Sequence, residues 1–267
     1  MKKFQTRTYE ILSTKIKDKR GVRFALLADL HGLEFGPENA DLLAQIEKSR
    51  PDAILAAGDM IVRIQKESLS VAENLLLKLA KKYPVFYSMG NHEFKMDLTG
   101  EFHEDFLEYE KRLQNGGVVI LHNESAVQTL GKTEFVIHGL ELPMEYFHKP
   151  NSPNLSMETL ERIIGKPDQK RVNILMAHSP KYGDTYLSWG ADLTVSGHYH
   201  GGILRFSEHC GLTCPQYLLF PPYCCGDFHR GDSHMIVSAG LGEHTIPVRI
   251  HNPRELLLID MKPEKEY

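Results

Sequence analysis

The feature that most constrains this chain is a set of short apolar runs that each end in polar, chemically reactive residues. Residues 25–32 read ALLADLHG, so an apolar strand pattern stops at Asp29 and His31. Charged side chains are costly to bury, and we therefore expect such a strand to end at the edge of a sheet. Four more apolar runs end the same way, at 53–57, 84–88, 172–177 and 192–196. The polar residues that follow them are Asp59, Asn91, His92, His178, His198 and His200.

Helical patterns between the first three runs predict a β-α-β-α-β opening. Leucines and isoleucines recur at helical spacing after Pro37, and again over residues 71–79. Such alternation predicts a parallel sheet with right-handed crossovers, whose strands end at one common edge. Ligand sites of open α/β sheets lie at that edge.

The rest of the chain continues the α/β pattern. Further strands are predicted near 118–121, 125–130, 134–139, 235–239, 246–250 and 256–260, and further helices near 106–113, 156–164 and before Gly190. Residues 1–20 are expected to form a strand or hairpin, and 141–155 and the Gly-, Pro- and aromatic-rich 201–234 to form loops. Two sheets packed face to face with helices outside fit this order better than one very wide sheet, within a single domain of residues 1–267.

Composition and charge limit the class of protein and the compartment that we expect. With 267 residues, 42% of them hydrophobic, the chain can bury a sizeable core. No apolar run approaches the ~20 residues that span a bilayer, and four cysteines bunched at 210–225 are too few to cross-link the domain. They also lack the spacing of zinc knuckles. We therefore expect a cytoplasmic protein, and the net charge of −4 predicts no nucleic-acid partner.

The spacing of the polar residues predicts a metal centre. Side chains at i and i+2 of an extended segment point the same way, so Asp29 with His31, and His198 with His200, can each offer two ligands. The strand endings supply seven oxygen and nitrogen donors, too many for one tetrahedral ion, whereas two divalent ions sharing a carboxylate would use them all. The absence of thiolates indicates Mn, Fe or Zn, with Mn favoured. The seven donors belong to Asp29, His31, Asp59, Asn91, His178, His198 and His200.

Each of these residues also has an ordinary interpretation when it is taken alone. Asp29 could be a helix N-cap, and the GNHE sequence at 90–93 could be a turn. Most single histidines are structural or exposed, and five others are assigned to that group: His103, His122, His138, His148 and His251. Five such strand ends are unlikely to arise by chance, and the metal-site interpretation is preferred.

The motifs D-x-H (29–31), G-D (58–59), G-N-H-E (90–93), a lone His (178) and G-H-x-H (197–200) resemble, in this order, the calcineurin-like metallophosphoesterases. The resemblance implies a four-layer α-β-β-α sandwich of two mixed sheets, with a dinuclear metal site at the C-terminal edge of the strands. HSPKY (178–182), GADLTVSGHYHGG (190–202) and the segment 238–256 are similar to a bacterial subgroup of phosphodiesterase-like members, some of them membrane associated.

The resemblance also implies a role for each polar residue. The implied ligands are Asp29, His31 and His200 for one metal, Asn91, His178 and His198 for the other, and Asp59 as the bridge. His92 would lie outside the metal shell, near the leaving-group oxygen. Many relatives carry another Asp shortly after the G-D pair, whereas residues 60–63 read MIVR here, which alters the mouth of the substrate site.

The predicted activity is metal-dependent hydrolysis of a phosphoester, with a phosphodiester favoured, by a hydroxide that bridges two divalent metals. His92 would protonate the departing alkoxide. The alternatives are a phosphomonoesterase or protein phosphatase of the same fold, and a non-catalytic protein-binding scaffold, although such scaffolds usually lose ligands. A nuclease would need a basic stripe, which the sequence lacks.

The substrate is predicted less closely than the reaction. A small phosphoester, nucleotide- or lipid-linked, is expected, and candidates to contact it are Tyr199, Arg205 and Arg249, with Arg230 as a further phosphate-binding candidate. The aromatic side chains of 201–234 could line an apolar cleft or make peripheral contact with a membrane. Their alternative role is to pack on the sheet, as the aromatic residues of long loops commonly do.

Overall fold

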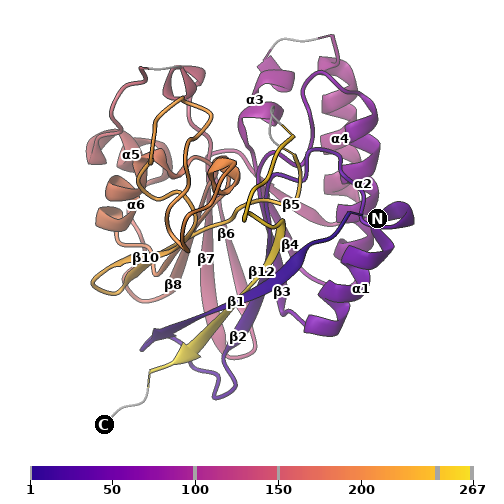
Figure 1. Cartoon of the computed structure of the whole chain (residues 1–267). Helices are drawn as coiled ribbons and strands as arrows, with labels where there is room; N and C mark the ends of the chain where they lie inside the picture. The colour runs from indigo at the N-terminus through magenta and orange to yellow at the C-terminus, as the bar shows by residue number, and fades with distance from the viewer. Residues whose placement is uncertain (1, 99–100, 149–150, 244–246, 265–267) are drawn as a thin grey trace.

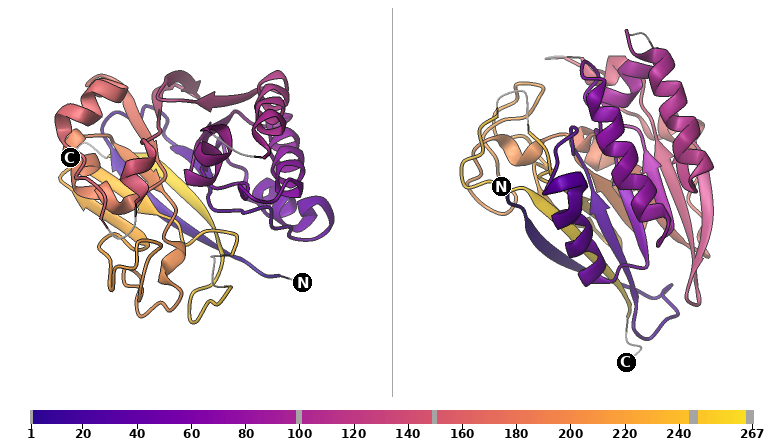
Figure 2. Two further views of the ribbon diagram at one scale, coloured as in Figure 1. Left: turned by 90° about the horizontal axis from the view of Figure 1, so that it is seen from above. Right: turned by 90° about the vertical axis from the view of Figure 1, so that its right-hand side faces the viewer.

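Two six-stranded sheets face each other, with helices on both outer faces (Figure 1). This computed structural model describes residues 2–98, 101–148, 151–243 and 247–264. The predicted α/β sandwich of two mixed sheets is confirmed. Viewed from above, the two sheets form the middle layers and the helices the outer ones (Figure 2).

The first sheet contains the β-α-β-α-β opening. Its strands, in spatial order, are β1 (Gln5–Ser13), β12 (Glu255–Pro263), β2 (Val22–Leu27), β3 (Ala53–Ala57), β4 (Val85–Ser88) and β5 (Val118–Leu121). Strands β2 to β5 are parallel, as the alternating pattern predicts, whereas β12 runs antiparallel to β2. The N-terminal segment, predicted as a strand or hairpin over residues 1–20, forms one strand, β1. This strand lies at an edge of the sheet and pairs in parallel with β12.

Amphipathic helices cover the outer face of this sheet. They are α1 (Ala40–Ser49), which follows a 3₁₀ turn η1 (Pro37–Asn39), α2 (Glu67–Ala80) and α4 (His103–Asn115). Their apolar side chains, such as Leu42 and Leu75, are fully buried against the strands. A short helix, α3 (Asn91–Leu98), begins directly where β4 ends, at a position where the sequence pattern indicated only a strand end.

The second sheet contains, in spatial order, β10 (Gly226–Arg230), β11 (Ser233–Val237), β9 (Leu193–Ser196), β8 (Val172–Ala177), β7 (Thr133–Leu140) and β6 (Ser125–Leu130). The four inner strands are parallel, and both edge strands are antiparallel to their neighbours. The helices on its outer side are α5 (Met157–Ile164) and α6 (Gly183–Trp189). Single 3₁₀ turns are η2 (Met144–Phe147), η3 (Pro180–Tyr182) and η4 (His200–Gly202).

Two local predictions were wrong. Strand β10 lies inside the segment 201–234, which was predicted to be a loop, because Gly226–Arg230 pairs with β11 as a hairpin. Of the predicted strand 246–250, residue 246 lies outside the described residues, and 247–250 form only an isolated bridge between Leu204 and Ile250. Val248 and Ile250 are exposed, and of residues 247–250 only the Arg249 side chain reaches inward, where its guanidinium donates to the carbonyls of Ala239 and Gly242.

The core lies between the sheets and fixes their relative placement. Leu26 and Leu55 of the first sheet and Ile174 and Val195 of the second are fully buried in one apolar cluster. This packing brings the C-terminal ends of β2, β3, β4, β8 and β9 together at one end of the sandwich. Among the helices in the described ranges, none has both the length and the apolar composition that crossing a membrane requires.

Candidate metal centre

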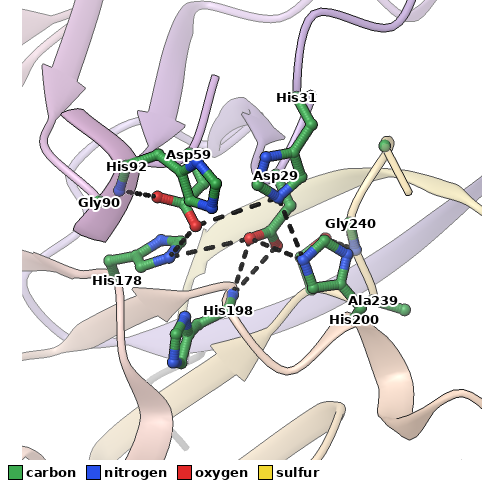
Figure 3. Close-up of polar contacts among 12 residues, drawn as sticks. Asp29, His31, Asp59, Gly90, His92, His178, His198, His200, Ala239 and Gly240 are labelled. Atoms are coloured by element: carbon green, nitrogen blue, oxygen red, sulfur yellow. Dashed lines mark hydrogen bonds and ion pairs between the residues drawn. The ribbon is translucent and has the colours of Figure 1, made fainter. Parts of the chain in front are cut away.

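The C-terminal ends of five strands bring the predicted ligands together from both sheets. Seven of the eight predicted metal-ligand and catalytic residues form three overlapping groups, and within each group the candidate ligand atoms lie within 4.8 Å of one another. The groups are Asp29–His31–His200, His31–Asp59–His92 and Asp59–His178–His198. The eighth residue, Asn91, lines the same cavity as His31 and Asp59. Figure 3 shows the two carboxylates turned toward the ring nitrogens.

The distances in this cluster suit shared cations. His178 Nε2 lies 3.1 Å from an oxygen of Asp59, and His200 Nε2 lies 3.6 Å from an oxygen of Asp29. His31 Nε2 and His200 Nε2 are only 3.2 Å apart. Burial lowers the pKa of His31 to about 3, so this ring is neutral and its nitrogen is available as a ligand.

Further atoms in the cluster have the chemistry of metal ligands. The Nδ1 of His178 donates to the carbonyl of Ala57 at 2.8 Å, which leaves Nε2 as the nitrogen with a lone pair. That Nε2 and the Oδ1 of Asn91 are buried and have no hydrogen-bond partner among the described residues. Buried polar atoms are rarely left unsatisfied, so two such atoms facing one cluster support a bound cation. The residues present therefore fit divalent metal ions.

The buried carboxylates have opposite pKa shifts. Burial raises the pKa of Asp29 to about 7. Burial acts in the same direction on Asp59, but the neighbouring His178 and His92 rings outweigh it and lower the pKa of Asp59 well below its ordinary value. At His178 burial lowers the pKa, but Asp59 and Asp29 outweigh it and raise the pKa to about 10, so protons compete with cations for this nitrogen.

Five of the clustered residues adopt a left-handed backbone conformation that non-glycine residues seldom use. Asp29, His31, Asp59, His198 and His200 have φ between 48° and 67°. Aspartate and histidine are among the residues that tolerate this region best, and strain of this kind concentrates at functional sites. The strands therefore do not simply end here. After each strand the backbone turns sharply, and the side chains of these residues point toward the cluster.

Gly58 makes one of these turns possible. Its φ is +84°, and a Cβ at this position would lie 2.6 Å from Gly90 N and 2.7 Å from His178 Nδ1. A larger residue would push the Asp59 turn away from its neighbours. The G-D sequence is thus required by close packing between the ends of β3, β4 and β8.

Glu93 supports the first-sheet side of the cluster, a role that sequence reasoning missed. Its fully buried carboxylate accepts hydrogen bonds from the backbone N–H groups of Asp59 (2.9 Å), Met60 (2.7 Å) and Gly90 (3.0 Å), and from the Tyr87 hydroxyl (2.7 Å). These donors tie the Asp59 turn to the start of α3. In the sequence, this role could have been inferred from the Glu that directly follows His92 in the GNHE motif.

The second-sheet side is held by contacts from elsewhere in the chain. The backbone N–H of His198 donates to both oxygens of Asp29 at 2.9 and 3.0 Å. The fully buried Gln216 places its side-chain amide 2.8 Å from His198 Nε2, and Asn252 donates to the His200 carbonyl at 2.6 Å. No sequence signal marked Gln216 or Asn252, because both lie on irregular segments.

His92 has the geometry of a proton donor beside the cluster. Its backbone N–H donates to Asp59 Oδ1 at 2.8 Å, and its Nδ1 accepts the backbone N–H of Arg63 at 3.1 Å. The proton of the neutral ring is therefore on Nε2. Burial lowers the pKa of His92, and the ring packs edge-on against His31 with 4.8 Å between centroids.

A cavity of about 740 Å³ opens over the cluster. This volume accommodates a small organic ligand. Besides His31, Asp59, Asn91 and His92, its walls include apolar side chains and three cationic ones. The cations are Lys2, Arg63 and Lys95, and the apolar residues include Leu33, Ile64, Phe147 and Pro215.

The residues predicted to contact substrate lie elsewhere. Arg205 is buried, donates to the carbonyls of Ser207 and Glu208, and faces Glu255. Tyr199 is buried outside the cavity walls. Arg249 donates to backbone carbonyls near Asp29, and its burial lowers its pKa to about 10. Arg230 pairs with Asp184 on the surface. None of the four is among the phosphate-binding residues that we propose.

Comparison with known proteins defines the class to which this fold and site belong. The sequence model of the calcineurin-like phosphoesterases matches residues 22–202, which is more than half of the chain. The protein belongs to the calcineurin-like phosphoesterase family.

Several curated proteins are similar to this chain. "Putative metallophosphoesterase F40B5.2" of Caenorhabditis elegans is 26% identical over 90% of this chain and 48% of its own length. Phosphodiesterase YaeI of Escherichia coli K12 is 28% identical over 68% of this chain and 62% of its own. A metallophosphoesterase of Aquifex aeolicus is 24% identical over 95% of this chain and 90% of its own. The chain thus spans about half of the C. elegans relative.

A solved structure shares the fold. The "Putative 5'-Nucleotidase" of Staphylococcus aureus superposes with a TM-score of 0.51 and 12% identity, over 92% of this chain and 55% of that one. At this identity the likeness concerns the fold alone.

Proposed function

We propose that this protein hydrolyses a phosphodiester with the help of two divalent metal ions, manganese being the favoured metal. The observation that carries the proposal is the convergence of carboxylate, amide and imidazole groups from both sheets, with neighbouring donor atoms 3.1 to 3.6 Å apart. A protein-binding scaffold has no use for such a buried donor set. The YaeI relative is named a phosphodiesterase, which supports the diester over the monoester.

We propose that one ion is held by Asp29, His31 and His200, the other by Asn91, His178 and His198, and that Asp59 is shared. Bound divalent ions lower the pKa of coordinated water and neutralise phosphate oxygens as charge develops on them. Asp59 is kept in place for this role by the His92 N–H, and its low pKa keeps it ionised near neutral pH.

His92 is proposed to act as the general acid. In the hydrolysis, water oxygen forms a bond to phosphorus, the bond from phosphorus to the leaving oxygen breaks, and one proton of the water passes to solvent. The proton on His92 Nε2 is transferred to the leaving oxygen, because Nδ1 accepts the Arg63 N–H and only Nε2 can face the substrate. Nε2 then regains a proton from solvent, which replaces the one released by the attacking water, so the ring is unchanged over the cycle.

The deciding experiment is a paired assay of bis-p-nitrophenyl phosphate and p-nitrophenyl phosphate with added Mn²⁺, together with metal analysis of the purified protein. We expect about two bound ions per chain and faster turnover of the diester. Preference for the monoester would favour a phosphomonoesterase. Absence of metal and of turnover on both compounds would favour the scaffold.

Replacing His92 tests the acid separately. His92→Ala should retain both metals but lower kcat by about a hundredfold on substrates with poor leaving groups, since general acid catalysis contributes about 10²–10⁴. The loss should be small for p-nitrophenolate, which needs no proton to depart. Equal losses on good and poor leaving groups would exclude this role.

A further inference from the structure

The cavity wall beside His92 contains two cations that the metal cluster does not use. Arg63 is fixed there by its backbone N–H, which donates to His92 Nδ1 at 3.1 Å. Lys95 follows His92 by three residues on α3, so the two side chains share one face of the helix. Both cations line the cavity, and both lie near enough for their positive charges to act on the His92 ring.

Their position beside His92 places Arg63 and Lys95 on the leaving-group side of the scissile bond. The phosphoryl group must lie against the clustered ligands, whereas His92 would face the oxygen that departs. Arg63 and Lys95 line the cavity together with His92, so a substrate group beyond that oxygen would lie near them. Arg63 also stands in the segment where many members of the resembled family place an aspartate, so a cation occupies the mouth of the site here.

The charges of the cavity walls make this side positive. Among the described residues that line the cavity, the two carboxylates are Asp59 and Glu243. Asp59 belongs to the ligand cluster, and Glu243 pairs with Arg254. The cationic side chains among the described lining residues are Lys2, Arg63 and Lys95. An anionic group entering on this side would meet complementary charge.

We propose that Arg63 and Lys95 bind a second anionic group, a phosphate or a carboxylate, on the leaving side of the scissile bond. The substrate class is then a phosphodiester whose leaving group carries its own negative charge. This inference rests on the proposed function, since it takes His92 as the marker of the leaving side. Arginine suits the role because its planar fork matches both phosphate and carboxylate oxygens.

The test compares two synthetic diesters whose leaving groups are similar in size and differ in charge. Both are methyl p-nitrophenyl phosphates, one with a carboxylate beside the nitro group and the other with a carboxamide. With Mn²⁺ and low salt we expect kcat/KM about tenfold higher for the carboxylate, each cation contributing about threefold, as for exposed ion pairs. Raising the salt to about 0.5 M should erase most of this preference. A third diester with a phosphonate at the same place distinguishes phosphate from carboxylate as the better group.

Variants assign the preference to the two residues. Arg63→Ala and Lys95→Ala should each lower the carboxylate-to-carboxamide ratio about threefold, and the double variant should bring it near one. Gln65→Ala is the matched control, because Gln65 lines the same wall without a charge and should leave the ratio unchanged. A wild-type ratio near one, or an unchanged ratio in the double variant with normal metal content, would overturn the proposal.

A binding measurement separates this proposal from the proposed function. The nitrophenol products, with carboxylate or carboxamide, can be titrated into the wild-type protein by calorimetry without any turnover. Tighter binding of the carboxylate product, lost in the double variant, supports the anion site even if neither diester is hydrolysed. Equal binding of the two products refutes the site even if both diesters are hydrolysed.

Discussion

The two sheets hold their shares of the candidate metal centre in different ways. On the first-sheet side, a single buried carboxylate, Glu93, accepts hydrogen bonds from the turn that carries Asp59 and from Gly90. On the second-sheet side, His178, His198 and His200 each depend on a different distant contact: Ala57 of β3, Gln216 of a loop and Asn252 near the C-terminal strand.

This difference shows which parts of the sequence position the candidate ligands of each sheet. Part of the first-sheet side is encoded locally, because residues 87–93 contain Tyr87, Gly90 and Glu93 together with the proposed ligand Asn91. The second-sheet side is assembled only after distant segments have packed. We therefore expect substitutions on the first side to change stability and metal binding together, and substitutions on the second side to change metal binding alone.

The largest effect should come from the residue that both halves share. Asp59→Asn removes the charge that faces His178 Nε2 at 3.1 Å and His31 Nε2 at 4.0 Å. We expect the loss of at least one metal and a fall in kcat of about a thousandfold, or some 4 kcal/mol of transition-state stabilisation. Metal analysis and steady-state kinetics measure both. A variant that keeps full metal content and activity would contradict the shared role.

Glu93→Gln should have the next largest effect. The amide keeps one acceptor oxygen and replaces the other by an NH2 group, which cannot accept the N–H groups that this oxygen binds, so we expect about 2 kcal/mol lower free energy of unfolding. Metal affinity should fall about 10- to 100-fold, as for other groups that orient metal ligands. Denaturant unfolding and Mn²⁺ titration are the measurements, with the exposed Glu108→Gln as control. Unchanged stability would contradict the role of Glu93 in holding the first-sheet side of the cluster.

Gln216→Leu should lower metal affinity about tenfold while changing the free energy of unfolding by less than about 1 kcal/mol. The small stability effect is expected because the Gln216 Oε1 already has no hydrogen-bond partner among the described residues. Gln216→Glu, which can still hold His198, should retain more affinity than the leucine variant, and the exposed Gln114→Leu should retain all of it. A stability loss as large as that of Glu93→Gln would contradict the expected difference between the first-sheet and second-sheet sides.

The smallest effect is expected far from the metal ligands, at His122. Its ring bridges Glu110 and Glu141 at 3.0 Å each, and these hydrogen bonds raise its pKa from 6.5 to about 10. A raised pKa stabilises the fold below about pH 6.5, and this contribution disappears as the pH rises through about 10. His122→Gln should therefore cost about 1 kcal/mol near pH 6, after allowance for partial exposure, and nothing above pH 10. Mn²⁺ affinity should be unchanged, and unfolding curves at several pH values test the window.

The sequence was sufficient for those parts of the fold that depend on local patterns. Apolar runs and helical spacing predicted strands β2, β3 and β4 and their common edge, and the polar residues at their ends predicted the cluster. The hairpin strand β10 was missed because its pattern is hidden among glycines and aromatics. The strand at 246–250 was predicted from apolar residues, of which Val248 and Ile250 are exposed rather than buried in a sheet.

The side chains that line the cavity could not be predicted for a different reason. An arginine can bind phosphate or cap backbone carbonyls, and only the packed structure distinguishes the two, as Arg205 and Arg249 show. Arg63 was noted only as a departure from the resembled pattern, although it is the arginine that lines the cavity. Gln216 reaches His198 through an irregular loop, whose path no local pattern specifies.

The position of β12 has a consequence for how the protein is made. Strand β12 lies between β1 and β2, so residues 5–13 and 22–27 are joined in one sheet only through residues 255–263. Until residues 255–263 have been synthesised, β1 and β2 have no strand between them to pair with. Long-range pairing of this kind is slow, and exposed strand edges attract other chains. Nascent polypeptides of this protein should therefore engage chaperones until residues 255–263 have left the ribosome.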